Sequence, residues 1–130
     1  MRLLLDTHIL LWSLSDARRL PEPVREAIES STNEILFSAA SIWEVAIKAQ
    51  MLRADFGVDA KTIIDAARET RFTELAITAQ HAATVAGLPL HHKDPFDRLL
   101  IGQALTEPAR LVTSDKALAA YSKDLVWLIA

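Results

Sequence analysis

Short apolar runs alternate along the chain with longer segments whose apolar positions follow a helical period. Residues 2–5 form the first apolar run, Asp6-Thr7 ends it, and residues 9–12 begin an apolar helix, so the N-terminus reads as strand, turn and helix. The rest of the chain repeats this order. It predicts strands at residues 2–5, 34–37, 72–77, 110–113 and 125–128, and helices from Ile9 and at residues 21–30, 38–52, 60–71, 78–86, 95–106 and 115–121.

Alternating strands and helices are typical of a parallel sheet with helices on both faces, so we expect an α/β fold. The chain has 130 residues, within the usual size of one domain, roughly 100–150 residues. No internal repeat or linker interrupts it, and its least regular stretch, residues 53–59, is interpreted as a surface loop. The sequence therefore predicts a single domain over residues 1–130.

Composition narrows the chemistry. Hydrophobic residues make up 51% of the chain, which is enough for a buried core. The absence of cysteine excludes disulfides, iron–sulfur clusters, thiolate zinc sites and thiol nucleophiles, so any metal must be held by oxygen or imidazole. A net charge of −3 does not suit a domain that binds nucleic acid through a broad basic surface, but it is compatible with a carboxylate site that contacts a polyanion locally.

The N-terminal residues Met1 to Leu5 briefly resemble a signal peptide, but Asp6 and His8 interrupt the apolar run and no small-residue cleavage site follows. No apolar run approaches the ~18 residues that a membrane span requires. We therefore expect a cytoplasmic protein with no membrane association.

Two acidic residues follow predicted strands. Asp6 ends the strand at residues 2–5, and Asp115 follows the segment 112–114. Ligands of open parallel sheets bind at the carboxyl ends of the strands, so both acids are candidates for chemistry. Asp is also a favoured helix N-cap, and both acids precede a predicted helix, so capping is an equal alternative.

Glu44 lies in a predicted helix, where two structural roles compete with chemistry. Ser41-Ile42-Trp43-Glu44 matches a capping box, and Lys48, four residues later, suits a helix-surface ion pair. The residues on the same side of the helix are nevertheless apolar, unlike those of a solvated face. They are Ala40, Ile47 and Met51.

Asp97 is similarly ambiguous, because Asp94, Pro95 and Asp97 suit the cap, first position and first turn of a helix. The positions that follow on its face are apolar, namely Leu100, Ile101 and Ala104. An acid that faces inward needs a partner, because burying it unpaired shifts its pKa or destabilises the fold.

Convergence of Asp6, Glu44, Asp97 and Asp115 would require their mutual repulsion to be offset. Two like charges ~4 Å apart cost about 4 kcal/mol at an effective dielectric near 20. A hard divalent cation offsets this cost, and oxygen ligands without cysteine favour Mg²⁺ or Mn²⁺ over zinc. The strand ends support convergence only for Asp6 and Asp115.

Four segments of the chain resemble, in their order and spacing, the signature segments of VapC-type PIN-domain ribonuclease toxins of type II toxin–antitoxin systems. The likeness extends over essentially the whole chain. A lone Asp-Thr or Ser-Asp is weak support, whereas the long segment with Asp-Pro-Phe-Asp-Arg together with the other three is highly specific. The segments are residues 5–12 (LDTHILLW), 41–44 (SIWE), 91–100 (HHKDPFDRLL) and 113–115 (TSD).

The resemblance implies a PIN-like, twisted, mostly parallel central sheet of about five strands with helices on both faces. It implies an acidic pocket formed by Asp6, Glu44, Asp97 and Asp115, with Asp94 left as a helix cap. It also implies RNA cleavage that leaves a 5′-phosphate and a 3′-hydroxyl, a homodimer, and a cognate VapB-like antitoxin whose C-terminal segment crosses the acidic groove.

The resulting hypothesis is Mg²⁺-dependent hydrolysis of an RNA phosphodiester, with Mn²⁺ as the other candidate ion. Asp6 and Asp97 are assigned as metal ligands, and Glu44 and Asp115 as residues that orient water or hold a second ion. His91 and His92 are interpreted as rim residues, because neighbours on an extended segment point opposite ways. Candidates for metal-site or phosphate contacts that equally suit ordinary turn or surface roles are Thr7, Ser114, Lys93, Arg98 and Lys116.

Other interpretations fit less well. A haloacid-dehalogenase-type hydrolase with Asp6 as nucleophile requires a second Asp where this chain has His8. A receiver-like signalling module requires an acceptor Asp after the third strand, and residues 76–78 contain none. The alternative that stays open is a catalytically inactive PIN-like module that binds RNA or another protein, which metal-dependent cleavage would distinguish from the toxin.

Overall fold

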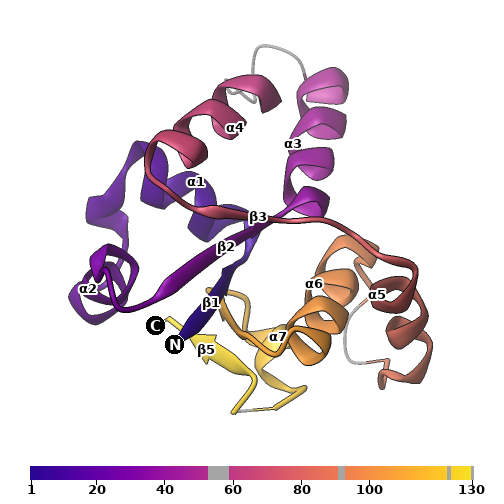
Figure 1. The fold of residues 1–130 in the computed structure, drawn as a ribbon. Helices are drawn as coiled ribbons and strands as arrows, with labels where there is room; N and C mark the ends of the chain where they lie inside the picture. Colours follow the sequence, from indigo (N-terminus) through magenta and orange to yellow (C-terminus); the bar gives the residue numbers. More distant parts are fainter. Residues whose placement is uncertain (53–58, 91–92, 123, 130) are drawn as a thin grey trace.

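The computed structural model describes residues 1–52, 59–90, 93–122 and 124–129 of the chain. In this part of the chain, five strands form one sheet in the order β3-β2-β1-β4-β5, and all four strand pairs are parallel (Figure 1). The strands are β1 Arg2–Leu5, β2 Glu34–Ser38, β3 Thr73–Leu75, β4 Arg110–Thr113 and β5 Val126–Leu128. The helices are α1 Thr7–Ser15, α2 Glu22–Glu29, α3 Ala39–Leu52, α4 Ala60–Glu69, α5 Ala79–Thr84, α6 Pro95–Thr106 and α7 Lys116–Ala119, with 3₁₀ turns η1 Ala17–Arg19 and η3 Val85–Gly87.

The central position of β1 follows from its sequence. Leu3, Leu4 and Leu5 are all 0% exposed, as is typical of a parallel strand covered on both faces. The register places Leu4 beside Leu36 of β2 and Leu111 of β4, which are also apolar and buried. The α/β prediction with a parallel central sheet is confirmed.

Two hydrophobic layers cover the sheet, because successive side chains of a strand point to opposite faces. One layer packs Leu3 and Leu5 of β1 against α1, α2 and α4. The other packs Leu4 against α6 and α7 (Figure 1). Helices therefore cover both faces, as predicted. Helix α3 leaves the carboxyl end of β2 and contacts α1, α4 and α6, so it lies over one end of the sheet.

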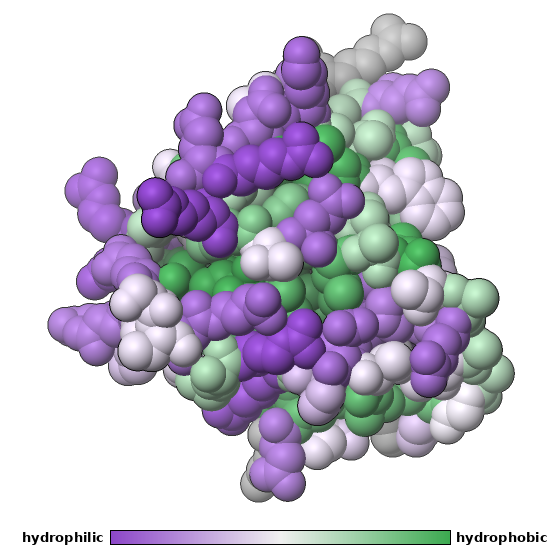
Figure 2. Space-filling model, in the orientation of Figure 1, coloured by the Kyte–Doolittle hydropathy of each residue, from purple (hydrophilic) through white to green (hydrophobic). Residues whose placement is uncertain are grey.

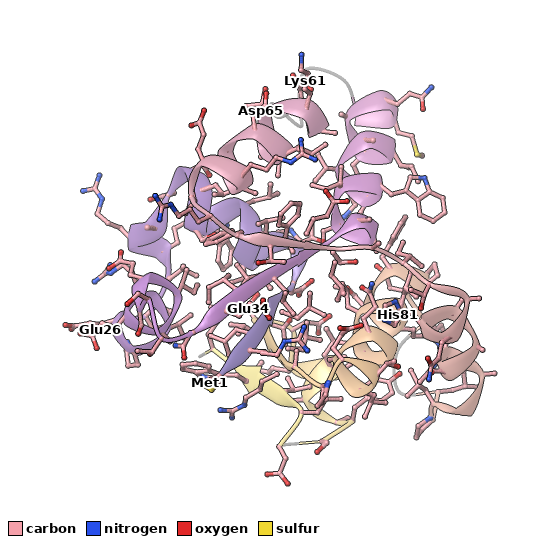
Figure 3. All side chains as sticks on the ribbon, in the orientation of Figure 1. Met1, Glu26, Glu34, Lys61, Asp65 and His81 are labelled. Carbon is pink, nitrogen blue, oxygen red and sulfur yellow. The ribbon has the colours of Figure 1, made fainter. Side chains whose placement is uncertain are left out.

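A polar contact joins α5 to the end of α6. His81 is 2% exposed, and its Nδ1 accepts the Thr78 backbone N–H at 3.0 Å. Its other ring nitrogen, Nε2, therefore carries the hydrogen and donates to Glu107 Oε2 at 2.7 Å. Figure 3 shows His81 between the two helices, on the side of the sheet that α6 covers.

The ends of most predicted elements differ from the structure by one or two residues, and two of them show why. The strand predicted at residues 72–77 covers only Thr73–Leu75, because its partner β2 ends at Ser38, which pairs with Leu75. The helix predicted at residues 115–121 covers only Lys116–Ala119, because Asp115 is its N-cap and Ala120 its C-cap. The loop predicted at residues 53–59 lies outside the described residues except for Asp59, which caps α4.

Large apolar side chains are also found on the surface. Trp43 is 57% and Met51 74% exposed, and both belong to α3. Met51 therefore does not belong to a buried apolar stripe beside Glu44, and the prediction is wrong at this residue. Figure 2 shows that hydrophilic side chains dominate the face in view, with apolar side chains visible near its centre. Among the described residues, none of the helices is long and apolar enough to span a membrane.

Candidate active site

The sheet order determines where a ligand-binding crevice can form. The order reverses between β1 and β4, because β2 and β3 extend the sheet on one side of β1 while β4 and β5 extend it on the other. Ligands of such sheets bind at the carboxyl ends of the strands beside this switch point. Asp6 follows β1 there, and Asp115 follows β4 after one intervening residue.

All four predicted acids line one pocket of about 240 Å³. Asp6 and Asp115 come from the strand ends, Glu44 from α3 and Asp97 from the first turn of α6. The other lining residues in the described part of the chain are His8, Lys48, Asp94 and Ser114. The pocket therefore gathers five carboxylates from four separate segments of the chain.

A larger hollow of about 570 Å³ lies beside the loops that precede β2 and β3, at the opposite ends of these strands. Residues 28–35 and 70–73 line it, with Glu29 and Glu34 as its acids. The smaller pocket has the higher density of carboxylates. Charge, and not volume, therefore marks the candidate site.

Asp6 is held rigidly at the bottom of the pocket. It is 5% exposed, its Oδ1 accepts the Thr7 backbone N–H at 2.7 Å, and its Oδ2 accepts the Thr113 hydroxyl at 2.6 Å. Burial raises the pKa of Asp6 and the charge of Glu44 adds to the rise, while the bonds from Thr113 and Thr7 and the proximity of His8 oppose it. The fold therefore keeps a carboxylate where its ionised form is disfavoured.

Glu44 is linked to Asp6 through Thr7. The Thr7 hydroxyl lies 2.7 Å from Glu44 Oε1 and donates its hydrogen to this carboxylate. The same hydroxyl lies 2.9 Å from Ser41 Oγ. The main-chain N–H of Thr7 holds Asp6 while its side chain holds Glu44, so one residue fixes both acids. Thr7 therefore has a role within the site as well as in the turn.

The capping box predicted for Ser41 and Glu44 is wrong. Helix α3 begins at Ala39, and the Ala40 N–H donates to Ser38 Oγ at 3.0 Å, so the cap lies three residues before Ser41. This shift leaves the Ser41 hydroxyl and the Glu44 carboxylate, which is 4% exposed, directed toward Thr7.

The ion pair predicted for Glu44 and Lys48 is confirmed, with Nζ 2.6 Å from Oε2. Its hydrogen bond raises the pKa of the Lys48 ammonium, and the charges of Glu44, Asp94 and Asp97 act in the same direction against partial burial. Lys48 therefore stays positively charged inside an acidic pocket.

The start of α6 carries two of the pocket acids. Asp94 is its N-cap and accepts the Phe96 N–H at 2.9 Å, as predicted, while Asp97 is half-buried in the first turn. The rings of Phe96 and Trp43 meet edge to face, with centroids 5.2 Å apart. This contact ties the start of α6 to α3 and thus sets Asp97 near Glu44.

Thr113 joins the ends of β1 and β4 and was missed by the sequence reasoning. It is 0% exposed, and its Oγ1 donates to Asp6 and accepts the Asp115 N–H at 3.0 Å. Asp115 in turn caps α7 by accepting the Ala117 N–H at 2.9 Å. A threonine at the carboxyl end of a buried strand, two residues before an acid, was the available signal.

Among the candidate phosphate contacts, Arg98 is engaged in hydrogen bonds within the protein. Its guanidinium donates to the carbonyl oxygens of Pro89 and Val85, both at 3.1 Å, and to the Tyr121 hydroxyl at 3.3 Å. Lys93 and Lys116 are exposed and are not among the described residues that line the pocket, whereas Ser114 is. His91 and His92 lie outside the described residues.

The donor set fits a hard divalent cation. Among the described residues, no three acidic or histidine side chains are placed to enclose a metal by themselves. Mg²⁺ does not require three, because it usually binds one or two carboxylates and completes its shell with water and substrate phosphate. A buried Asp6 whose ionised form is disfavoured beside Glu44 is an arrangement that such a cation stabilises.

The chain is similar to known proteins over most of its length. The PIN domain family model matches residues 3–124. The chain is 32% identical over 119 residues to Ribonuclease VapC22 of Mycobacterium tuberculosis, covering 91% of this chain and 90% of that protein.

Two solved structures share the fold. One is VapBC2 from Rickettsia felis bound to a DNA fragment from its promoter, with a TM-score of 0.74, 15% identity and full coverage of both chains. The other is a domain of a functionally unknown protein from Methanocaldococcus jannaschii, with a TM-score of 0.63, 15% identity, and coverage of 99% of this chain and 91% of that one. The family model and the VapC22 relative together show that this chain is a VapC-type member of the PIN-domain family.

Proposed function

We propose that the chain is a metal-dependent endoribonuclease and the toxin of a VapBC-like toxin–antitoxin pair. The observation that carries this proposal is the convergence of Asp6, Glu44, Asp97 and Asp115 on one pocket at the switch point of the sheet. Similarity to a protein named as a ribonuclease over nine-tenths of the chain supports the reaction class. We assign the catalytic role to these four acids and Mg²⁺ as the ion, with Mn²⁺ as its substitute.

Asp6 and Asp97 are the proposed metal ligands. When bound, Mg²⁺ lowers the pKa of an attacking water and neutralises charge that develops on the phosphoryl oxygens. The chain's own groups prepare the site for this ion. Thr7 and Thr113 each give Asp6 one hydrogen bond, which fixes the direction of its remaining lone pairs.

Glu44 and Asp115 are the proposed groups that orient the water. Each carboxylate is anchored through a hydrogen bond, Glu44 by the Thr7 hydroxyl and Asp115 by the Ala117 N–H, and each faces the pocket. An anchored carboxylate can accept a hydrogen bond from the attacking water and so orient it. The products are an RNA end with a 5′-phosphate and one with a 3′-hydroxyl.

The proposed partner is a VapB-like antitoxin whose C-terminal segment crosses the acidic pocket. The Rickettsia felis structure, a VapBC protein whose fold this chain shares, supports such a partner. We further propose that the toxin is a homodimer that acts in the cytoplasm, and that residues 1–130 form one PIN domain, which the match over residues 3–124 supports.

Cleavage of total bacterial RNA by purified, antitoxin-free protein tests the proposal. We expect discrete cuts with 5′-phosphates that require Mg²⁺ or Mn²⁺ and disappear in Asp6→Asn. The matched control is Asp65→Asn, since Asp65 is an exposed acid of α4, away from the pocket (Figure 3). This control should cleave like the wild type.

Two results would count against the proposal. Cleavage by Asp6→Asn at the wild-type rate would mean that the pocket does not perform the reaction. An absence of cleavage across many RNAs, with RNA still bound, would favour an inactive PIN-like binding module.

A further inference from the structure

Lys48 places a positive charge in a pocket that is otherwise acidic. Among the described residues that line the pocket, it is the only lysine or arginine, beside five carboxylates. An RNA phosphate that approaches these carboxylates is repelled, so a fixed cation at the pocket changes what can bind there.

Lys48 combines a partly exposed side chain with a contact to a buried acid of the pocket. Its Nζ lies 2.6 Å from Glu44 Oε2, and the Glu44 side chain is 6% exposed while that of Lys48 is 41% exposed. The lysine therefore reaches from solvent to a buried acid, and its charged end lies between the two. The charges of Asp94 and Asp97 also act on it.

A plain helix-surface ion pair accounts for the contact but not for its surroundings. Such pairs normally join two solvated side chains, whereas this one joins a half-exposed lysine to an acid that is buried within the proposed catalytic pocket. The other cations near the site offer no substitute. Arg98 is bonded to backbone oxygens, and Lys93 and Lys116 do not line the pocket as described.

We propose that Lys48 is a substrate-binding residue whose ammonium holds Glu44 and a non-bridging oxygen of the RNA phosphate at the same time. An ammonium has three hydrogen-bond donors, so one can serve the carboxylate and another the phosphate. This inference rests on the proposed RNA cleavage. It identifies Lys48 as the residue that admits a polyanion into an acidic pocket.

The first test measures binding without metal, where no cleavage occurs. A fluorescein-labelled RNA oligonucleotide that spans the strongest mapped cut is titrated with wild type, Lys48→Gln, Lys48→Arg and Lys61→Gln in EDTA, across a range of salt concentrations. Lys61 is an exposed lysine of α4 and provides the matched loss of one charge away from the pocket (Figure 3).

Lys48→Gln should bind about tenfold more weakly, since it loses a charged hydrogen bond. Its slope of log affinity against log salt should be shallower by about 0.7, as expected for one lost contact to a single-stranded phosphate. Lys61→Gln should match the wild type, and Lys48→Arg should recover most of the affinity. Wild-type melting temperature in Lys48→Gln would show that the loss is local.

Cleavage by the same variants separates this inference from the proposed function. If wild type cleaves RNA and Lys48→Gln cleaves more slowly with unchanged affinity and salt slope, Lys48 only orients Glu44 and the phosphate contact is refuted. If Lys48→Gln equals the wild type in both assays, the inference fails while the nuclease stands. If wild type neither binds nor cleaves RNA, the proposed function itself fails.

Discussion

The substitution Asp6→Asn should make the metal-free protein more stable at neutral pH while it removes the proposed activity. Asp6 is 5% exposed and accepts two hydrogen bonds, from the Thr7 N–H and the Thr113 hydroxyl. Asparagine has nearly the same shape and carries no charge; its single oxygen can accept the Thr7 N–H, and its amide nitrogen can donate to the Thr113 hydroxyl oxygen. The variant therefore removes a buried charge with little change in packing.

The magnitude follows from opposing contributions. Transferring a carboxylate from water to the interior costs free energy. The charge-assisted part of each of its two hydrogen bonds stabilises the ionised form by about 1 kcal/mol. The pKa of Asp6 is raised, with burial as the main cause, so the cost of burying the charge exceeds the contribution of the two hydrogen bonds. We expect the variant to gain on the order of 1 kcal/mol, or roughly 4 °C in melting temperature.

The pH dependence of unfolding tests independently whether Asp6→Asn is more stable than the wild type. An acid with a raised pKa in the folded state binds its proton more tightly when folded, so the wild type loses stability as pH rises from the ordinary value of 3.8 through the folded pKa. The difference between variant and wild type should be full at neutral pH and should close as the pH falls toward about 4.

Urea unfolding in EDTA at several pH values measures this difference, with Asp65→Asn as the exposed control that should stay within about 0.5 kcal/mol of the wild type. Added Mg²⁺ should stabilise the wild type more than Asp6→Asn, because a ligand that binds only the folded state raises its stability. A variant that is less stable at neutral pH, or a gain that persists unchanged at acid pH, would refute the reasoning.

Three further substitutions test individual contacts. Thr113→Val should lower the free energy of unfolding by about 1–3 kcal/mol, because the buried Asp6 oxygen loses its donor, and it should slow RNA cleavage; urea unfolding and single-turnover cleavage measure the two effects. Arg98→Met should lower the melting temperature, because backbone oxygens lose their donor, yet leave the salt slope of RNA binding unchanged; a shallower slope would show a phosphate contact. Gly102→Ala should destabilise, since its Cβ would lie 3.0 Å from the His81 carbonyl oxygen and overpacking of about 1–3 kcal/mol exceeds the helix-propensity gain of about 1 kcal/mol; a raised melting temperature would contradict this.

Most of the fold could be predicted from the sequence because its elements are strongly periodic. Continuous apolar runs such as residues 2–5 specify buried parallel strands, and helical spacing of apolar positions is clearest in α2 and α4. Element ends were less predictable where distant partners decide them. The strand at Thr73–Leu75 is short because β2 ends at Ser38, which local sequence near residue 75 does not encode.

The candidate site was predictable to different degrees. Asp6 and Asp115 could be inferred from strand ends alone, while Glu44 and Asp97 needed the resemblance to VapC-type proteins. The position of Lys48 in the pocket and the bridge made by Thr113 depend on contacts between segments far apart in sequence. Arg98 beside Asp97 suggested a phosphate contact, but its bonds to Val85 and Pro89 could be seen only in the fold.

Helix capping and a place in the acidic pocket, which the sequence presented as alternatives, coexist in the same residues for a physical reason. Asp6, Asp94 and Asp115 each accept a backbone N–H at the start of a helix, and each also lines the pocket. The positive end of a helix lowers the cost of holding a carboxylate, so three helices that begin at one place allow acids to gather there. Lys48 offsets part of the remaining negative charge, yet the pKa of Asp6 stays raised. The clustered carboxylates therefore destabilise the metal-free fold, and a bound cation would stabilise it.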